Sequence, residues 1–220
     1  MPLAVDGFGE AVVSVPETAD GPVPVVVAVH GNYNRPDTLC DAWRPVFRGA
    51  FLLCPRGVPR HDSPSLADQR YTFETTTALG EEIDRGLAAL RARFGARVDG
   101  GPAVYAGFSL GAIMGVFVTA HSASTFPRVV LVEGGTDRYV PDVLDGFAKG
   151  GGRRVLFVCA QPDCATDAPF TIARLEAAGV KAECVIGPPI GHRYDGAIAD
   201  TIRGALPWLL EGDARFRSTL

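Results

Sequence analysis

Several features that would point to particular classes of protein are missing from this sequence. No run of apolar residues approaches the length of about 20 that a membrane-crossing helix needs. Basic residues are not in excess, since 21 Lys and Arg stand against 25 Asp and Glu, and the net charge is −4. That balance argues against nucleic acid or an anionic membrane surface as a partner. Residues Met1 to Asp6 lack the basic and apolar regions of a signal peptide, so we expect a cytoplasmic protein with no transmembrane segment.

Signatures of bound cofactors are missing as well. The glycine pair Gly107 and Gly111 lacks the lysine that would make a phosphate-binding loop, and no dinucleotide fingerprint occurs. No cysteine or histidine spacing matches a zinc site. We therefore expect neither a cofactor nor a metal.

The cysteines do not form a recognisable disulfide framework. There are five, an odd number, and their spacing is scattered. Cys54, Cys159 and Cys184 lie in apolar, strand-like runs and are expected to be buried as small hydrophobic residues. Cys159 and Cys164 are close enough in sequence to bridge across a tight loop, so a disulfide between them is left open.

What the sequence does contain fits one globular domain spanning residues 1–220. Of these 220 residues, 47% are hydrophobic and 21% charged, which is enough apolar material for a sizeable core. Strand-like and helix-like segments alternate. The expected strands are 8–15, 23–29, 50–54, 104–108, 128–132, 155–159 and 182–186, and the expected helices are 36–46, 76–94, 110–122, 140–149, 169–178 and 196–210. This alternation predicts an α/β fold with a mostly parallel sheet covered on both faces.

The helix expected at 76–94 has the strongest helical pattern. Leu79, Ile83 and Leu87 recur every three or four residues, while charged residues that include Glu82 are expected on the opposite, solvent-facing side. The polar loop from 58 to 72 is long enough to have a functional role. The chemically interesting residues of the chain follow strands, and in open α/β sheets that edge is where ligands bind.

The stretch Gly107-Phe108-Ser109-Leu110-Gly111 follows a β-branched strand and precedes a helix. This is the context of a nucleophile elbow, in which a serine projects its hydroxyl from a sharp strand-to-helix turn. Glycines at 107 and 111 would remove the Cβ atoms that collide in so tight a turn. Ser109 is therefore the candidate nucleophile.

A serine nucleophile needs a base, and four histidines are available. His192 follows the last expected strand in a loop short enough to reach Ser109, so it is the candidate general base. His30 ends a strand, and its expected role is to shape that turn by hydrogen bonding. His61 lies in the polar loop and His121 near a helix end, and neither has an evident partner.

The carboxylate that would orient this base has several candidates. Asp163 lies just beyond the strand ending at Cys159 and is the first choice, giving the chain order Ser, Asp, His that accompanies this elbow. Asp167 is a weaker alternative from the same segment. Glu133 and Asp137, which follow the preceding strand, could also supply the carboxylate.

The remaining site candidates are hydrogen-bond donors and aromatic residues. The backbone N–H of Leu110 and one from the loop after residue 29 would form an oxyanion hole, with Asn32 as the expected second donor and Gly31 as the alternative. Four aromatic side chains are expected near the same rim and are candidate substrate-binding residues: Tyr33, Trp43, Tyr71 and Phe73.

Five segments together suggest a family: His30-Gly31, Cys54-Pro55-Arg56-Gly57, Gly107-Phe108-Ser109-Leu110-Gly111, Asp163 and Gly191-His192. With these residues the chain resembles the α/β-hydrolases, and more narrowly the small carboxylesterase and phospholipase-type serine esterases. The resemblance implies an α/β-hydrolase fold with a central sheet of about seven strands and helices on both faces. Residues 134–153 are too few for a large lid domain, which implies an open site for small or accessible acyl substrates.

The sequence therefore predicts a serine hydrolase that cleaves a small-molecule carboxylic ester through an acyl-enzyme, with the triad Ser109, His192 and Asp163. A thioesterase, peptidase or acyltransferase would use the same triad. A non-catalytic binding protein on a hydrolase fold is the rival from another class, because fold does not fix function.

Overall fold

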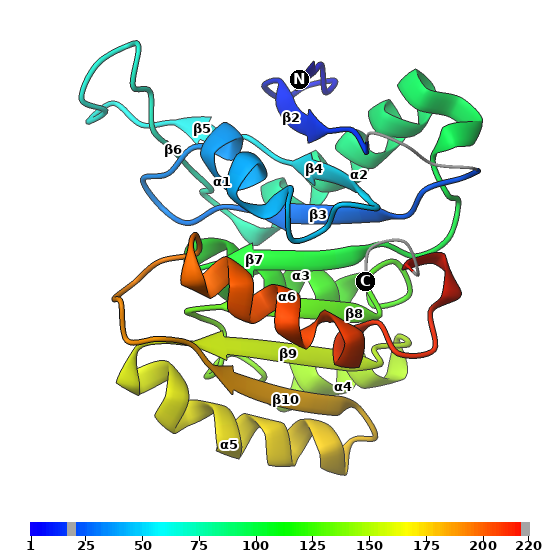
Figure 1. Cartoon of the computed structure of the whole chain (residues 1–220), viewed down its shortest axis with the longest axis vertical. Coiled ribbons are helices and arrows are strands. Elements are labelled where there is room, and N and C mark those ends of the chain that lie inside the picture. Colours follow the sequence, from blue (N-terminus) through cyan, green and yellow to red (C-terminus); the bar gives the residue numbers. More distant parts are fainter. Residues whose placement is uncertain (17–20, 217–220) are drawn as a thin grey trace.

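The structure is a computed structural model that describes residues 1–16 and 21–216. Its centre is an eight-stranded sheet in the order β1-β2-β4-β3-β7-β8-β9-β10 (Figure 1). The strands are β1 (Pro2–Leu3), β2 (Ala11–Ser14), β3 (Val25–Val29), β4 (Phe51–Cys54), β7 (Val104–Phe108), β8 (Arg128–Val132), β9 (Arg154–Cys159) and β10 (Lys181–Ile186). Strands β1 and β2 pair antiparallel, as do β2 and β4, and every pairing from β4 to β10 is parallel.

Both faces of the sheet are apolar, and helices cover each of them. Alternate residues of β3 enter different cores: Val25 and Val27 join one, Val26 and Ala28 the other. The first core is shared with α2 (Thr76–Phe94), α3 (Leu110–His121), α4 (Pro141–Lys149) and α5 (Pro162–Ala177), and the second with α1 (Pro36–Trp43) and α6 (Ala197–Leu209). In Figure 1, α1 and α6 lie in front of the sheet while α3 and α4 lie behind it. Continuous apolar strands of this kind are what a sheet buried on both faces requires.

The alternation of strands and helices expected from the sequence is confirmed, with one substantial difference at α5. That helix begins at Pro162, whereas the sequence suggested a start at Pro169. Pro162 is favourable in the first turn because its missing N–H would have no partner there. Pro169 lies inside the helix and is tolerated there. As a result, Asp163 belongs to the first helical turn.

The loop between β4 and α2 contains a small second sheet. Its strands β5 (Val58–Pro59) and β6 (Tyr71–Thr72) pair antiparallel, and β6 also forms an isolated bridge through Tyr71 to Asn34. The segment 58–72 is therefore hydrogen-bonded to the loop that follows β3. Two short 3-10 helices, Gly95–Arg97 and Ala214–Phe216, complete the described elements.

Glu82 of α2 is buried, contrary to the solvent-facing position expected from its helical pattern. Its carboxylate accepts hydrogen bonds from the backbone N–H groups of Arg56 and Gly57, which form the turn after β4. Burial raises the pKa of the Glu82 carboxyl, while these two N–H groups oppose the shift. The side chain therefore joins α2 to the turn at the carboxyl end of β4.

Across residues 1–16 and 21–216, no helix is both long and apolar enough to cross a membrane.

Candidate active site

The turn at Ser109 has the strand–turn–helix geometry that its sequence predicts. Strand β7 ends at Phe108, α3 begins at Leu110, and Ser109 between them has a φ of 52° and a ψ of −116°. A φ in this region is uncommon for a residue other than glycine and clusters at functional sites. A Cβ on Gly111 would lie 2.4 Å from the carbonyl oxygen of Val29, and one on Gly107 would lie 2.5 Å from the carbonyl oxygen of Gly111. Both positions therefore need glycine, as expected.

His192 reaches the serine from the loop that follows β10. Its Nε2 lies 2.8 Å from Ser109 Oγ, and its Nδ1 lies 2.8 Å from Oε1 of Gln161. The imidazole packs against the Phe108 ring, with 4.8 Å between the ring centroids, and its side chain is 42% exposed. An Nδ1–H donated to Gln161 would leave Nε2 unprotonated and facing the hydroxyl, which is the arrangement of a general base.

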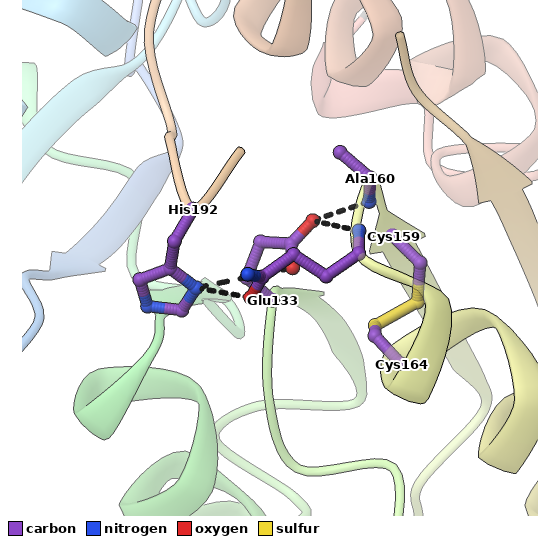
Figure 2. Close-up of a disulfide and its surroundings, with 6 residues drawn as sticks. Glu133, Cys159, Ala160, Cys164 and His192 are labelled. Atoms are coloured by element: carbon purple, nitrogen blue, oxygen red, sulfur yellow. Dashed lines mark hydrogen bonds and ion pairs between the residues drawn. A yellow bond between two sulfur atoms is a disulfide. The ribbon is translucent and has the colours of Figure 1, made fainter. Parts of the chain in front are cut away.

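The carboxylate beside His192 belongs to Glu133, which follows β8 directly (Figure 2). Its Oε2 lies 3.9 Å from His192 Nδ1, and its side chain is only 1% exposed. Oε1 accepts hydrogen bonds from the backbone N–H groups of Ala160 and Gln161, while Oε2 is buried and has no hydrogen-bond partner within the described part of the chain. A buried carboxylate oxygen without a partner needs a functional or electrostatic reason, and the neighbouring imidazole provides one.

Asp163, the first choice for this carboxylate from the sequence, is not brought to His192. It is exposed in the first turn of α5, and within the described ranges no hydrogen bond or ion pair joins it to the imidazole. The cause is the early start of α5, since the chain is already helical at Pro162 and Asp163 lies exposed in that first turn. Asp137 pairs with Arg138, and Asp167 lies further along α5, exposed. Of the four candidate carboxylates, all of them in the described residues, Glu133 is thus the one that lies beside the imidazole.

The loop after β3 lies against the elbow, as an oxyanion hole requires. A Cβ on Gly31 would lie 3.0 Å from the Cβ of Ser109, so the backbone approaches the serine closely at this point. Leu110 is the first residue of α3, and the first N–H groups of a helix have no partner within it. The Asn32 side chain accepts a hydrogen bond from Arg60, which connects the loop after β3 to the chain after β5.

His30 shapes this loop, as the sequence suggested. The side chain is fully buried, with Nδ1 2.7 Å from the carbonyl oxygen of Gly31 and Nε2 3.0 Å from that of Arg56. Burial lowers the pKa of His30, although the two carbonyl contacts oppose the shift. The imidazole therefore connects the oxyanion loop with the turn after β4.

The four aromatic candidates divide between the surface and the core. Tyr33 is 40% exposed and has a φ of 56°, and the guanidinium groups of Arg60 and Arg70 lie 5.4 and 5.8 Å from the centroid of its ring. Tyr71 is half-buried beneath Arg56.

Trp43 and Phe73 are buried. Trp43 is fully enclosed and donates from Nε1 to the backbone oxygen of Tyr194, whose ring packs on Phe108. Phe73 packs on His30, with ring centroids 4.6 Å apart. These two side chains support the site from the core and do not form its surface.

Four of the five cysteines form disulfides. Cys159 pairs with Cys164, the bond left open from the sequence, and Cys40 pairs with Cys54, which the sequence did not reveal. The Cys40–Cys54 disulfide joins α1 to the end of β4. These two elements meet only through tertiary packing, so a local sequence pattern does not reveal the bond. Cys184 is free and half-buried, and burial together with the nearby negative charge of Glu133 raises the pKa of its thiol to about 11.

Two residues at the site were not identified from the sequence: Gln161, which contacts His192 Nδ1, and Phe108, whose ring supports the imidazole. Gln161 directly precedes Pro162 just beyond β9, at the same edge of the sheet as the other site residues. That position beyond a strand end is the signal in the sequence that could have identified Gln161.

Comparisons with known proteins identify the fold. No family model matches the chain, and no curated protein matches it in sequence. Among solved structures, the carboxylesterase of Bacillus cereus is similar with a TM-score of 0.67 and 17% identity, covering 98% of this chain and 96% of its own. Est1E from Butyrivibrio proteoclasticus has a TM-score of 0.66 and 14% identity over 96% of this chain and 98% of its own. Esterase PE8 has a TM-score of 0.64 and 15% identity over 91% and 98%.

The chain thus has the α/β-hydrolase fold expected from its resemblance, with eight strands in the central sheet and, among residues 1–16 and 21–216, no large lid domain. The additional strand relative to the expected seven is β1, which is only two residues long.

Proposed function

We propose that this protein is a serine hydrolase that cleaves carboxylic esters through an acyl-enzyme, with Ser109, His192 and Glu133 as its catalytic residues. The proposal rests chiefly on one contact: Nε2 of His192 lies 2.8 Å from Oγ of Ser109, at a turn where Ser109 has a positive φ. An imidazole within hydrogen-bond reach of a serine on a nucleophile elbow is the arrangement that activates a hydroxyl for acyl transfer.

In the first step, Oγ of Ser109 attacks the ester carbonyl carbon while Nε2 of His192 accepts the hydroxyl proton. The ring becomes an imidazolium, whose charge would be stabilised by the carboxylate of Glu133, with Oε2 3.9 Å from Nδ1. Because Glu133 is buried, its charge is poorly screened by water and acts more strongly on the ring than a surface carboxylate would.

The carbonyl oxygen becomes negative in this step and needs hydrogen-bond donors. The N–H of Leu110 at the start of α3 is the first, and the N–H of Asn32 is the second, with that of Gly31 as the alternative. Removing one such donor in other serine hydrolases costs on the order of 3 kcal/mol of transition-state stabilisation. The close approach of Gly31 to Ser109 makes a donor from this loop geometrically reasonable.

The intermediate then collapses as His192 returns the proton to the leaving alcohol, leaving an ester on Ser109. Water enters, His192 removes its proton, and the same sequence releases the carboxylic acid and restores the serine. The esterases with similar folds are consistent with this chemistry. Since the part of the chain that the structure describes contains no large lid domain, we propose small or accessible acyl esters as substrates.

Labelling by a fluorophosphonate tests the proposal most directly. The wild type should be labelled on Ser109 and should hydrolyse short p-nitrophenyl esters, and Ser109→Ala should do neither. Ser124→Ala, an exposed serine in the turn after α3, is the matched control and should behave as wild type. A wild type that is neither labelled nor active on these esters would favour the non-catalytic binding protein.

A further inference from the structure

The turn closed by the Cys159–Cys164 disulfide lies beside the proposed catalytic residues and contacts two of them. Cys159 is the last residue of β9, and Cys164 lies in the first turn of α5 (Figure 2). Between them, the backbone N–H groups of Ala160 and Gln161 donate to Glu133 Oε1. The same turn supplies the Gln161 side chain, whose Oε1 lies 2.8 Å from His192 Nδ1.

We propose that this disulfide-closed turn is a positioning element for His192, acting through Gln161, an inference that rests on the proposed function above. Gln161 accepts the hydrogen bond that fixes the ring's orientation and tautomer. Glu133, whose Oε2 is 3.9 Å from the same nitrogen, supplies the negative charge behind it. The orienting hydrogen bond and the stabilising charge thus come from different residues.

The chemistry of imidazole explains why the Gln161 contact matters. A neutral histidine carries one N–H, and the partner of Nδ1 decides which nitrogen is left free to accept a proton. At 3.9 Å, Glu133 is beyond normal hydrogen-bond distance, so it cannot define the tautomer by itself. The amide oxygen of Gln161, 2.8 Å from Nδ1, is close enough to accept its proton in a hydrogen bond and so to define the tautomer.

The disulfide matters because Gln161 is held through its backbone and not through packing of its side chain. The residue is exposed at the surface, and it lacks the packing that would hold a buried side chain in one rotamer. Gln161 is the N-cap residue of α5, and its backbone N–H donates a hydrogen bond to Glu133. It also lies within the short loop that the Cys159–Cys164 disulfide closes. Cys159 is fully buried and Cys164 is 8% exposed, so the cross-link joins the turn to the core.

The first test compares substitutions of Gln161. Gln161→Ala should lower kcat for a p-nitrophenyl ester about tenfold, the effect of losing one orienting hydrogen bond, while KM changes less than twofold. Gln161→Glu keeps an acceptor oxygen and adds a charge, so it should restore most of kcat. The added charge should also raise the pKa of His192 and so move the acidic limb of the kcat/KM profile toward higher pH by about one unit. The shift verifies that residue 161 contacts the imidazole, and the recovery of kcat distinguishes an orienting acceptor from a role in folding alone.

The second test isolates the cross-link. In the Cys40→Ala/Cys54→Ala variant the remaining disulfide is Cys159–Cys164. Dithiothreitol reduces it: the S–S bond breaks, Cys159 and Cys164 become thiols, and the reagent is oxidised to its cyclic disulfide. Before reduction, this variant should have the kcat of the wild type. After it, with thiol titration confirming that both cysteines are free, kcat should fall several-fold and recover on reoxidation. Cys159→Ala/Cys164→Ala should reproduce the reduced state.

The outcomes separate this inference from the function on which it depends. If the wild type is labelled on Ser109 and active, but Gln161→Ala and reduction both leave kcat and the pH profile unchanged, the positioning role is wrong and the esterase stands. A decrease in kcat that Gln161→Glu does not restore, with no shift in the profile, would also overturn it. Absence of labelling in the wild type would remove the proposed function itself.

Discussion

Ser109 and Glu133 occupy matching places on neighbouring parallel strands, each one residue beyond the strand end. Phe108 pairs with Val132 in the register of β7 and β8, and both following residues have a positive φ, 52° for Ser109 and 53° for Glu133. The N–H of Ser109 donates to Val132, and the N–H of Glu133 donates to Val158, so the ladder of the sheet extends to both residues. Two costly backbone conformations are thus held side by side by the sheet.

The first prediction concerns the carboxylate. Glu133→Gln keeps the shape of the side chain and its bonds to the turn after β9, but it removes the charge near His192. We expect kcat/KM for a p-nitrophenyl ester to fall roughly 10²- to 10⁴-fold, the range typical of neutralising a triad carboxylate. Asp163→Asn is the matched control and should stay within twofold of wild type. Steady-state kinetics would contradict the assignment if the two effects were reversed.

The second prediction concerns the fit of α3 beneath the end of β3. Gly111→Ala would place a methyl group 2.4 Å from the carbonyl oxygen of Val29, and neither backbone can easily move. We expect the free energy of unfolding to fall by roughly 2 kcal/mol or more, as overpacking of a tight contact does. Gly80→Ala, in α2 with open space around it, should instead stabilise by about 0.5–1 kcal/mol. Urea denaturation measures both, and equal effects would refute the packing argument.

The third prediction separates the stabilising effects of the two disulfides. The bond between Cys40 and Cys54 spans 14 residues and that between Cys159 and Cys164 only 5. Loop-closure entropy therefore predicts that replacing the first pair by alanine costs about 3 kcal/mol, and replacing the second about 2 kcal/mol. Chemical denaturation under non-reducing conditions tests this order. A larger loss from the shorter loop would show that this entropy does not control the difference.

The fourth prediction concerns pH. Burial lowers the pKa of His30 in the folded protein, so the unfolded chain takes up a proton near pH 6.5 that the folded chain resists. The free energy of unfolding should therefore fall as pH drops below about 6.5, with a slope from this residue of up to about 1.4 kcal/mol per pH unit. His30→Gln should flatten that slope, whereas His121→Gln, at an exposed position, should leave it intact. Identical slopes in all three proteins would exclude His30 as the source.

The arrangement of the fold could be predicted from the sequence because it depends on local patterns. The β-branched runs of β3 and β7, the leucine spacing of α2 and the glycines of the elbow each identify their own element. The proposed nucleophile and base were chosen from the same patterns, since Ser109 and His192 both lie beyond strand ends, and the structure places their side chains within hydrogen-bond distance.

What could not be predicted depended on how segments distant in sequence meet. Asp163 was the first choice because it lies just beyond a strand end and gives the chain order Ser, Asp, His, but Pro162 starts a helix and Asp163 lies exposed in its first turn. Glu82 looked like a surface residue in the pattern of α2, and only the turn after β4 explains its burial. Trp43 was considered a rim residue, but its place is decided by packing against Tyr194, which is 151 residues away.

The near-contact between Gly111 and the end of β3 has a mechanical consequence. The helix carrying Leu110 and the strand leading to Gly31 and Asn32 approach closely at Gly111 and Val29, so neither proposed anion donor can move far without displacing the other. The cavity for the negative oxygen would then keep its dimensions while outer loops fluctuate, and its rigidity would come from the sheet beneath it.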